Sequence, residues 1–91
     1  MVHELKILPV FFDEVRTGKK RFELREDDRG FAVGDALILR EWKPSEGYTG
    51  REIRTEITYI LRDAPEYGLL EGYCILSLGR ISTVLRRAWE C

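Results

Sequence analysis

The chain has 91 residues, of which 44% are apolar and 34% charged, and its formal net charge at pH 7 is −1. We expect one domain with one hydrophobic core, because a chain this short buries too little surface for a second, catalytic domain. The near-neutral charge argues against a protein that holds long nucleic acid by bulk attraction, so a nucleic-acid role would need a local patch or pocket.

The sequence also lacks the usual signs of export, membranes and metals. Its longest apolar runs, such as residues 36–39, are far shorter than the ~20 residues of a membrane-spanning helix. Its start carries Glu4 and Lys6 instead of an apolar signal segment. Cys74 and Cys91 form no C-x-x-C pair or Cys/His cluster. We therefore expect a cytoplasmic protein without metal, cofactor or membrane partner, in which Cys74 is a small buried residue.

The chain begins with a predicted strand and helix. Residues 3–8 alternate loosely between apolar and charged positions, which predicts a strand. Pro9 suits the first turn of a helix and Gly18 follows its last turn, so the pattern predicts a helix over about 9–17. The apolar stripe of this helix consists of Phe11, Phe12 and Val15.

Four more strands are predicted along the chain. Residues 21–25 alternate cleanly, with Phe22 and Leu24 on one face and the charged side chains on the other. After a polar loop and a turn at Gly34-Asp35, the remaining strands are residues 36–42, 51–61 and 73–78. Gly- and Pro-containing loops separate them at residues 43–50 and 63–72. In the long strand we expect Ile53, Thr55, Ile57, Tyr59 and Leu61 to face inward and Glu52, Arg54 and Glu56 to face water.

The last residues follow a different pattern. Apolar side chains recur at helical spacing after Ser82, a residue suited to a helix N-cap. They are Ile81, Val84, Leu85, Ala88 and Trp89. This pattern predicts a short C-terminal helix.

These elements predict a mainly β (α+β) domain of five to six strands with one N-terminal helix. In so small a domain, exposed strand edges invite pairing with other chains, and closing the sheet removes them. We therefore expect a closed or nearly closed β-barrel.

The motif G-x-K-x-x-E-x-R, at Gly18 to Arg25, is the strongest functional signal. Glu23 and Arg25 share one strand face, roughly 6–7 Å apart. A carboxylate accepts hydrogen bonds and a guanidinium donates them, so the pair could bind the edge of a nucleobase or an amide. Lys20 has the opposite parity and joins them only if it precedes the strand, in the turn after Gly18 or at a bulge. The alternative is that these charges are merely a solvated strand face.

Two other residues are candidates for a ligand-binding site. His3 is the only histidine, and on an apolar strand face it is either a core histidine or a pocket residue. Trp42 ends a predicted strand and either packs in the fold or offers a surface on which a base can stack.

Gly18, Lys20, Glu23 and Arg25 resemble the signature of ASCH domains, a PUA-like superfamily associated with RNA. A subgroup of small proteins of the DUF3850 type is similar over roughly residues 3–79, which leaves 80–91 as a C-terminal extension. The similar segments are His3-Glu4-Leu5-Lys6, Phe22-Glu23-Leu24-Arg25, Asp28-Arg29 with Phe31, Gly34-Asp35, Glu41-Trp42 and Glu71-Gly72-Tyr73. The resemblance implies a PUA-like barrel with the helix beside a cleft and the charged motif at that cleft.

The resemblance implies binding of RNA or a modified nucleoside, and it leaves open whether the domain is also an enzyme. One ASCH branch hydrolyses the acetyl amide of N4-acetylcytidine with a Lys, a Thr and a Glu. Lys20 matches that lysine, Glu23 stands where the threonine falls, and no residue matches the distal glutamate. A small amidohydrolase acting on an N4-acylated cytidine, with Lys20 and Glu23 as candidate catalytic residues, is therefore the alternative. A second alternative is a protein-interaction adaptor that uses aromatic loop residues.

Overall fold

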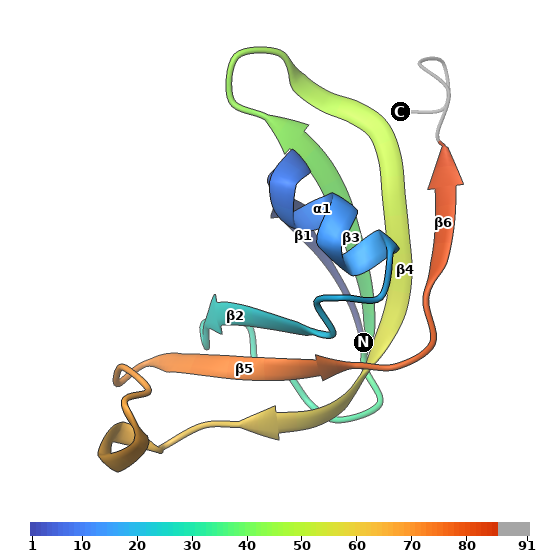
Figure 1. Cartoon of the computed structure of the whole chain (residues 1–91). Helices are drawn as coiled ribbons and strands as arrows, with labels where there is room; N and C mark the ends of the chain where they lie inside the picture. The colour runs from blue at the N-terminus through green and yellow to red at the C-terminus, as the bar shows by residue number, and fades with distance from the viewer. Residues whose placement is uncertain (86–91) are drawn as a thin grey trace.

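Two β-sheets share one long, bent strand in the computed structural model, which describes residues 1–85 (Figure 1). The elements are β1 (Val2–Ile7), α1 (Pro9–Arg16), β2 (Phe22–Glu26), β3 (Ala36–Lys43), β4 (Gly47–Leu61), the 3₁₀ turn η1 (Pro65–Tyr67), β5 (Tyr73–Leu78) and β6 (Ser82–Leu85). The first half of β4 pairs with β3 and β6, and its second half pairs with β5. β1 joins β3 in parallel and β2 joins β5 antiparallel, which gives the order β1-β3-β4-β5-β2. The mainly β class with one N-terminal helix is confirmed.

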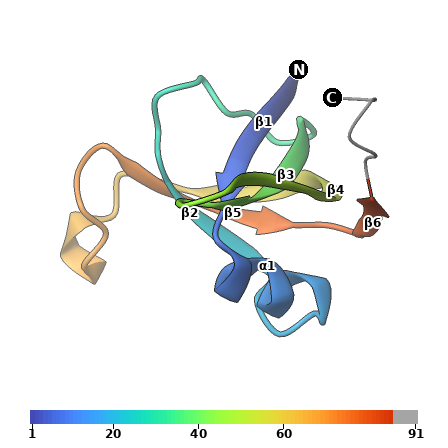
Figure 2. The same cartoon turned by 90° about the horizontal axis from the view of Figure 1, so that it is seen from above.

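Helix α1 covers one side of the strands, while the loop between β2 and β3 lies on the other side (Figure 2). The helix begins at Pro9, whose fixed φ suits the first turn. Phe12 and Val15 point into the core and are buried, as the apolar stripe predicted. Phe11 was expected to join them, but 46% of its surface is exposed, because it lies on the flank of the helix that faces β2.

The core fills the space between α1 and the two sheets. Alternate positions of each central strand point into it, as expected for side chains on a pleated strand. The clustered residues are Leu5, Ile7, Phe12, Val15, Phe31, Leu37, Leu39, Ile53, Ile57, Cys74, Leu76 and Leu78. Cys74 is fully buried, as predicted, and this burial raises the pKa of its thiol.

The sheet is not closed into a barrel by backbone pairing within residues 1–85. β1 and β2 stand at the two ends of the strand order and share no ladder. Two arginine side chains span the gap between them instead. The Arg25 guanidinium donates to the Lys6 carbonyl at 2.5 Å, and that of Arg29 donates to the Glu4 carbonyl at 2.9 Å. We call this gap the seam. The two guanidiniums give carbonyls at the edge of β1 hydrogen-bond donors without a further strand.

Strand β4 differs from its prediction in where it begins and in the burial of Glu52 and Tyr59. The strand begins at Gly47, so much of the predicted 43–50 loop is sheet. Ile53, Thr55 and Ile57 are buried as predicted, but Glu52 is also buried (1% exposed) and Tyr59 is 60% exposed. The pairing register shifts between Arg40 and Trp42 of β3 and between Ile57 and Tyr59 of β4. The bulge between Ile57 and Tyr59 reverses the side-chain alternation beyond it, which exposes Tyr59. Glu52 keeps its predicted face, because the ladder is regular up to Arg40–Glu52, and it is buried there beside Arg40 and Arg54 at 3.6 and 3.4 Å.

The predicted C-terminal helix is wrong for residues 82–85. Ser82–Leu85 form β6, which pairs with Arg51–Arg54 of β4 on the side away from β3. Three β-branched or hydroxyl side chains in succession favour a strand once an unpaired edge is available. Ala88 and Trp89, the other positions of the predicted helix, lie outside the described residues. No helix within residues 1–85 has the length and apolar character needed to cross a bilayer.

Asp35 fastens the start of β1 to the turn before β3. His3 Nε2 lies 2.8 Å from Asp35 Oδ2, the terminal amine of Met1 lies 3.0 Å from Oδ1, and the Ala32 amide also donates to the carboxylate. The hydrogen bond from His3 contributes most to lowering the pKa of Asp35 from its ordinary value of 3.8 to about 2. The folded chain therefore stabilises the ionised form of Asp35 more than the unfolded chain does.

This lowered pKa predicts an acid-sensitive contribution to stability. Between the two pKa values the unfolded chain binds more protons than the folded one, so stability falls as the pH drops from about 4 to about 2. We expect Asp35→Asn to flatten the dependence of the unfolding free energy on pH in this interval. Urea titrations at several pH values measure it. His3→Gln removes the hydrogen bond that contributes most to the lowered pKa of Asp35, so it should also flatten the pH dependence of the unfolding free energy in this interval. A pH dependence that is unchanged in both variants would contradict this assignment.

Candidate functional site

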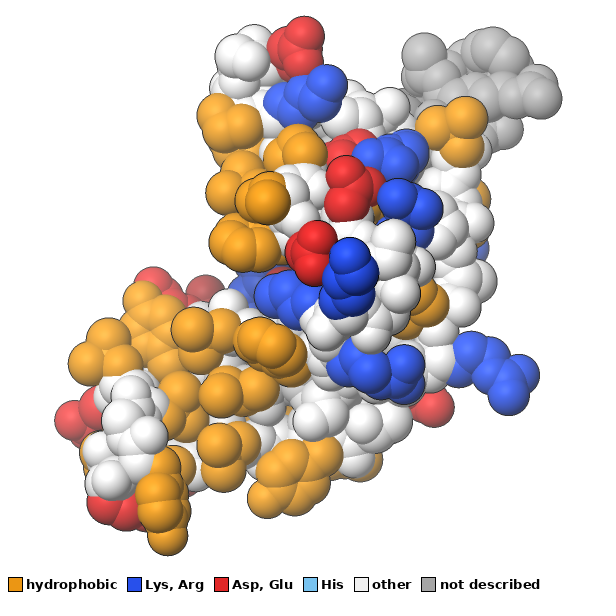
Figure 3. All heavy atoms as spheres, in the orientation of Figure 1, with side chains coloured by type: hydrophobic (Ala, Val, Ile, Leu, Met, Phe, Trp, Pro, Cys, Tyr) orange, Lys and Arg blue, Asp and Glu red, His pale blue; other side chains and the backbone are white. Residues whose placement is uncertain are grey.

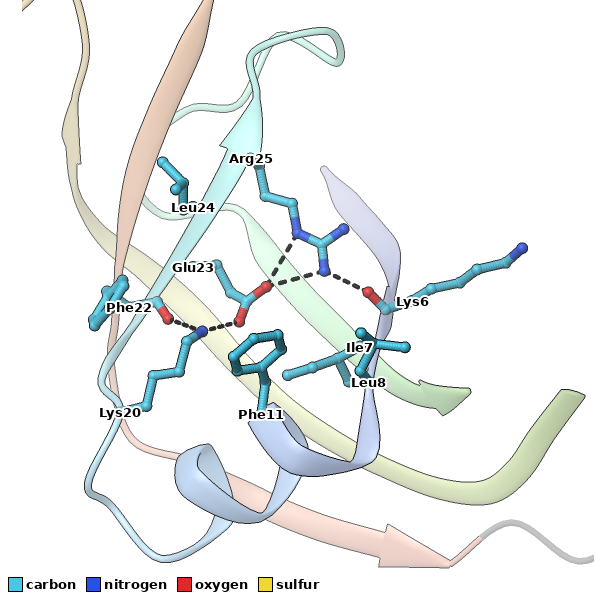
Figure 4. A pocket seen from close by; sticks show the side chains of 9 residues that line it. All are labelled: Lys6, Ile7, Leu8, Phe11, Lys20, Phe22, Glu23, Leu24 and Arg25. Atoms are coloured by element: carbon cyan, nitrogen blue, oxygen red, sulfur yellow. Dashed lines mark hydrogen bonds and ion pairs between the residues drawn. The ribbon is translucent and has the colours of Figure 1, made fainter. Parts of the chain in front are cut away.

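A cleft of about 440 Å³ opens at the seam, between the end of β1, helix α1 and strand β2 (Figure 4). Its walls combine a mostly apolar surface with a few charged groups. The lining residues are Lys6, Ile7, Leu8, Phe11, Lys20, Phe22, Glu23, Leu24 and Arg25. The cleft therefore contains the three charged residues of the G-x-K-x-x-E-x-R motif.

The chain reversal at Gly18 places Lys20 at the cleft. Gly18 has a φ of +82°, in the left-handed region that favours glycine. Beyond it, the amides of Lys19 and Lys20 both donate to the Glu14 carbonyl, at 3.0 and 2.9 Å, which ties the turn to the end of α1. Lys20 thus precedes β2 and escapes the strand alternation. The predicted position of Lys20, before the strand and within reach of Glu23, is confirmed.

Substitution of Gly18 tests this turn. No heavy atom lies within 4 Å of a Cβ built at Gly18, so the cost of Gly18→Ala comes from backbone strain alone. We expect a loss of about 1 kcal/mol in the free energy of unfolding, measured by urea titration. Gly18→Asn should lose less, because asparagine tolerates the left-handed region better than alanine. Equal stability of wild type and Gly18→Ala would show that the turn adopts another conformation.

Glu23 lies between two cations at the centre of the cleft (Figure 4). Lys20 Nζ donates to Glu23 Oε1 at 2.5 Å and to the Phe22 carbonyl at 2.7 Å. Arg25 Nε donates to Glu23 Oε2 at 3.0 Å, and the same guanidinium reaches across the seam to the Lys6 carbonyl. Only 4% of Glu23 is exposed. The predicted grouping of Lys20, Glu23 and Arg25 is therefore present, and it is a connected network.

Strand β2 turns the face of Glu23 inward and the face of Phe22 and Leu24 outward. Glu23 is buried, whereas Phe22 and Leu24 are 44% and 55% exposed. β2 is the last strand of its sheet, and its inward face meets the polar seam instead of the apolar core. Burial of a carboxylate requires compensating partners, and Lys20 and Arg25 supply them. The alternative of a merely solvated charged face is wrong for Glu23.

The cleft offers hydrogen-bond donors beside two aromatic rings. Lys20 Nζ lies 5.6 Å from the ring centre of Phe11 and 4.8 Å from that of Phe22. Within the described chain, Arg25 Nη1 makes no hydrogen bond, and the Lys20 ammonium has three protons for two acceptors. Of the three cationic residues that line the cleft, Lys20 and Arg25 contact Glu23, whereas the Lys6 side chain points away from it toward Trp42. Such a site suits a flat ligand with apolar faces and several acceptor atoms.

The structure separates His3 and Trp42 from this cleft. His3 is 5% exposed, bound to Asp35, and packed edge-on against Phe31 with ring centres 4.7 Å apart. This matches the core alternative. Trp42 is half-buried, and the Lys6 ammonium lies 4.5 Å above its ring. Trp42 therefore stands behind a residue of the cleft wall and does not line the cleft itself.

A second buried ion pair lies away from the cleft. Glu41 is 3% exposed and accepts hydrogen bonds from Arg51 at 2.8 and 2.9 Å and from Thr49 at 2.7 Å. The Arg51 hydrogen bonds lower the pKa of Glu41, and Glu41 in turn raises that of Arg51. Arg51 also covers the ring of Phe12 at 4.5 Å, which joins β4 to α1. We assign this pair to the fold, because its contacts join β3, β4 and α1.

Within residues 1–85, no group of three or more His, Cys, Asp or Glu side chains is arranged to hold a metal ion. The residues that sequence reasoning missed are the cleft's apolar wall, above all Leu8 and Phe11, and its rim residue Lys6. The one usable signal for Phe11 was its place beside Phe12, since two adjacent helical positions lie about 100° apart around the axis and point in different directions.

Comparisons with known proteins relate the chain to a family and to a phage protein. A family model described as "Domain of unknown function (DUF3850)" matches residues 2–78, which include every residue lining the cleft. The chain is also similar to the "Uncharacterized 12.9 kDa protein in GpA 3'region" of Escherichia phage P2, with 41% identity over 75 residues. That match covers 82% of this chain and 65% of the phage protein, so the chain spans less than two thirds of the relative.

Proposed function

The chain belongs to the DUF3850 family, and from this premise we propose that it is a non-catalytic module whose cleft binds a base of RNA or a modified nucleoside. We further propose that the fold is an opened PUA-like barrel of the ASCH type. The G-x-K-x-x-E-x-R residues support this relation, because they meet at one cleft beside the helix. The phage relative is uncharacterised, so the argument for binding rests on the cleft.

One observation supports the proposal most directly. A buried carboxylate and two cations converge at the floor of a cleft whose walls are apolar and aromatic. The volume of about 440 Å³ lies within the roughly 300–1,000 Å³ of small-ligand sites. Phe11 or Phe22 can stack on a base, and base stacking on aromatics contributes ~1–3 kcal/mol. The N–H groups of Lys20 and Arg25 that make no hydrogen bond within the described chain can then donate to the carbonyl and ring-nitrogen acceptors of the base edge.

The same contacts make hydrolysis the weaker alternative. An amidohydrolase needs a group that can accept a proton from water or attack the amide carbon. Lys20 Nζ already donates hydrogen bonds to Glu23 and to the Phe22 carbonyl. Both Glu23 oxygens already accept from a cation, and no other carboxylate lines the cleft. These residues are therefore arranged to hold a ligand rather than to activate water.

A nucleoside screen by NMR tests the proposal. The ¹⁵N-labelled protein is titrated with the four ribonucleosides, with N4-acetylcytidine and with short single-stranded RNAs. We expect amide shifts concentrated at Phe11 and residues 20–25, with no cytidine released from N4-acetylcytidine. Cytidine release that disappears in Lys20→Ala would replace the proposal with the amidohydrolase. Shifts confined to the exposed loop around Tyr67, or none at all, would reject a nucleoside site and leave the adaptor.

A further inference from the structure

A second cavity of about 390 Å³ adjoins the cleft, and the two share Lys20. It lies where α1 ends, where β2 begins and where β5 has just ended. Its lining residues are Val15, Gly18, Lys20, Arg21, Leu78, Gly79, Arg80 and Ile81. We infer that this cavity is a phosphate subsite and that the full ligand is a nucleotide, free or within RNA, rather than a nucleoside. This inference rests on the proposed function of the cleft.

The charge of the second cavity differs from that of the rest of the surface. Within residues 1–85, Arg21 and Arg80 form no ion pair and no side-chain hydrogen bond, and both are exposed. Every other described arginine pairs with a carboxylate: Arg16, Arg25, Arg29, Arg40, Arg51, Arg54 and Arg62. These two arginines line the second cavity together, and no Asp or Glu is among its lining residues.

Backbone contacts bring these two arginines together from distant parts of the chain. The Leu78 amide donates to the Arg21 carbonyl at 3.1 Å, which holds the residue before β2 beside the residues that follow β5. Glu56 lies beside this segment, and its carboxylate Oε1 would be 3.4 Å from a Cβ built at Gly79. Glu56 does not line the cavity. The residues that line the cavity thus carry positive charges on Lys20, Arg21 and Arg80 and no negative charge.

A phosphate suits this arrangement of two arginines. A guanidinium donates two parallel hydrogen bonds to phosphate oxygens, and two guanidiniums can bind one phosphate from two directions. Lys20 is engaged with Glu23 in the cleft, so Arg21 and Arg80 provide the charge for the phosphate. Figure 3 shows Lys and Arg side chains across the middle of this face, with Asp and Glu side chains among them, beside a broad hydrophobic area. A base in the cleft thus has positive charge directly next to its sugar.

The test compares nucleosides with nucleotides on the same variants. Chemical-shift titrations use each ribonucleoside, its 3′- and 5′-monophosphate, a mixed-sequence RNA pentanucleotide, and inorganic phosphate alone. The variants are Arg21→Gln, Arg80→Gln and the control Lys19→Gln. Lys19 is exposed and adjacent to the cavity without lining it, so the control removes one positive charge but none of the proposed contacts. Melting temperatures confirm that each variant is folded.

We expect one monophosphate series to bind roughly ten- to a hundredfold more tightly than its nucleosides. Arg21→Gln and Arg80→Gln should each lose most of this difference and leave nucleoside binding unchanged, whereas Lys19→Gln should keep it. Tighter binding of the pentanucleotide than of the monophosphates would identify RNA as the source of the phosphate; the reverse would identify a free nucleotide. A phosphate advantage that is absent, or that Lys19→Gln weakens equally, would overturn the inference.

Inorganic phosphate separates this inference from the proposed function. If no nucleoside or nucleotide binds but phosphate shifts the amides of Gly79 and Arg80, and Arg80→Gln abolishes these shifts, the proposed base site fails. In that case the anion subsite itself stands. If phosphate alone produces no shifts and the monophosphates bind no better than nucleosides, the subsite is rejected even where the cleft binds nucleosides.

Discussion

Replacing Phe12 with alanine is expected to destabilise the domain by about 3–5 kcal/mol. Phe12 is fully buried in the core, and its ring also lies under the Arg51 guanidinium. Its loss leaves a cavity between α1 and the sheets that the neighbouring side chains can fill only in part. A domain of this size has roughly 5–15 kcal/mol of total stability, so this one substitution should remove a large share of it.

Phe11 is the matched control, because it is the adjacent residue of the same helix and the same side-chain type. Since 46% of it is exposed, Phe11→Ala should cost only about 1 kcal/mol of stability. It should instead weaken binding of a nucleoside, by ~1–3 kcal/mol if the ring stacks on the base. Urea unfolding and nucleoside titration of both variants measure the two effects. Equal destabilisation would mean that Phe11 also packs in the core and is not part of the cleft wall.

Removing the Glu23 side chain is the second change with a large expected effect. In Glu23→Ala, Lys20 and Arg25 lose their shared partner and repel each other inside the seam. Breaking a buried ion pair costs about 3–5 kcal/mol. The side chains of Lys20 and Arg25 remain 18% and 25% exposed, so water can solvate them in part. We therefore expect a loss somewhat below this range, about 2–3 kcal/mol.

The hairpin between β3 and β4 provides the control for Glu23. Lys43 and Glu46 form an ion pair with the same spacing as Lys20 and Glu23, but their side chains are 48% and 67% exposed. Glu46→Ala should cost less than about 1 kcal/mol. Urea titrations at low and high salt compare the two variants. High salt should restore part of the stability of Glu23→Ala alone, because it screens the repulsion between Lys20 and Arg25. If both variants lose equally little, Glu23 is an ordinary surface residue.

Much of the fold could be predicted because its signals are local. The strand alternation, Pro9 and Gly18 are enough to place the first strand, the helix and the turn to β2. The bulges in β3 and β4 could not be predicted, since a bulge depends on how two strands pair and leaves no local pattern. The error at β6 has a similar cause. The tail pairs with an edge of β4 whose availability depends on the whole topology.

The candidate site was predictable in its charged part and not in its apolar part. Gly18 permits the turn that brings Lys20 to Glu23, and that relation can be read from the motif. The exposed apolar wall cannot be, because Phe11, Phe22 and Leu24 look like core residues in the sequence. His3, conversely, was a candidate for the site in the sequence but does not line the cleft. It shares a strand with Lys6 and Ile7, but three to four residues along a strand is roughly 10–13 Å, which places it with Asp35 and away from the cleft.

The measurement that tests the central claim most directly is the affinity of wild type, Arg25→Ala and Glu23→Gln for the best nucleoside of the screen. Arg54→Ala serves as a control, because Arg54 also pairs with a glutamate two residues away but lies outside the cleft. Melting temperatures are recorded on the same samples. If the cleft is the site, the first two variants remain folded and lose roughly 1.5–3 kcal/mol of binding, while Arg54→Ala binds like wild type. Unchanged affinity in both Arg25→Ala and Glu23→Gln would contradict the claim.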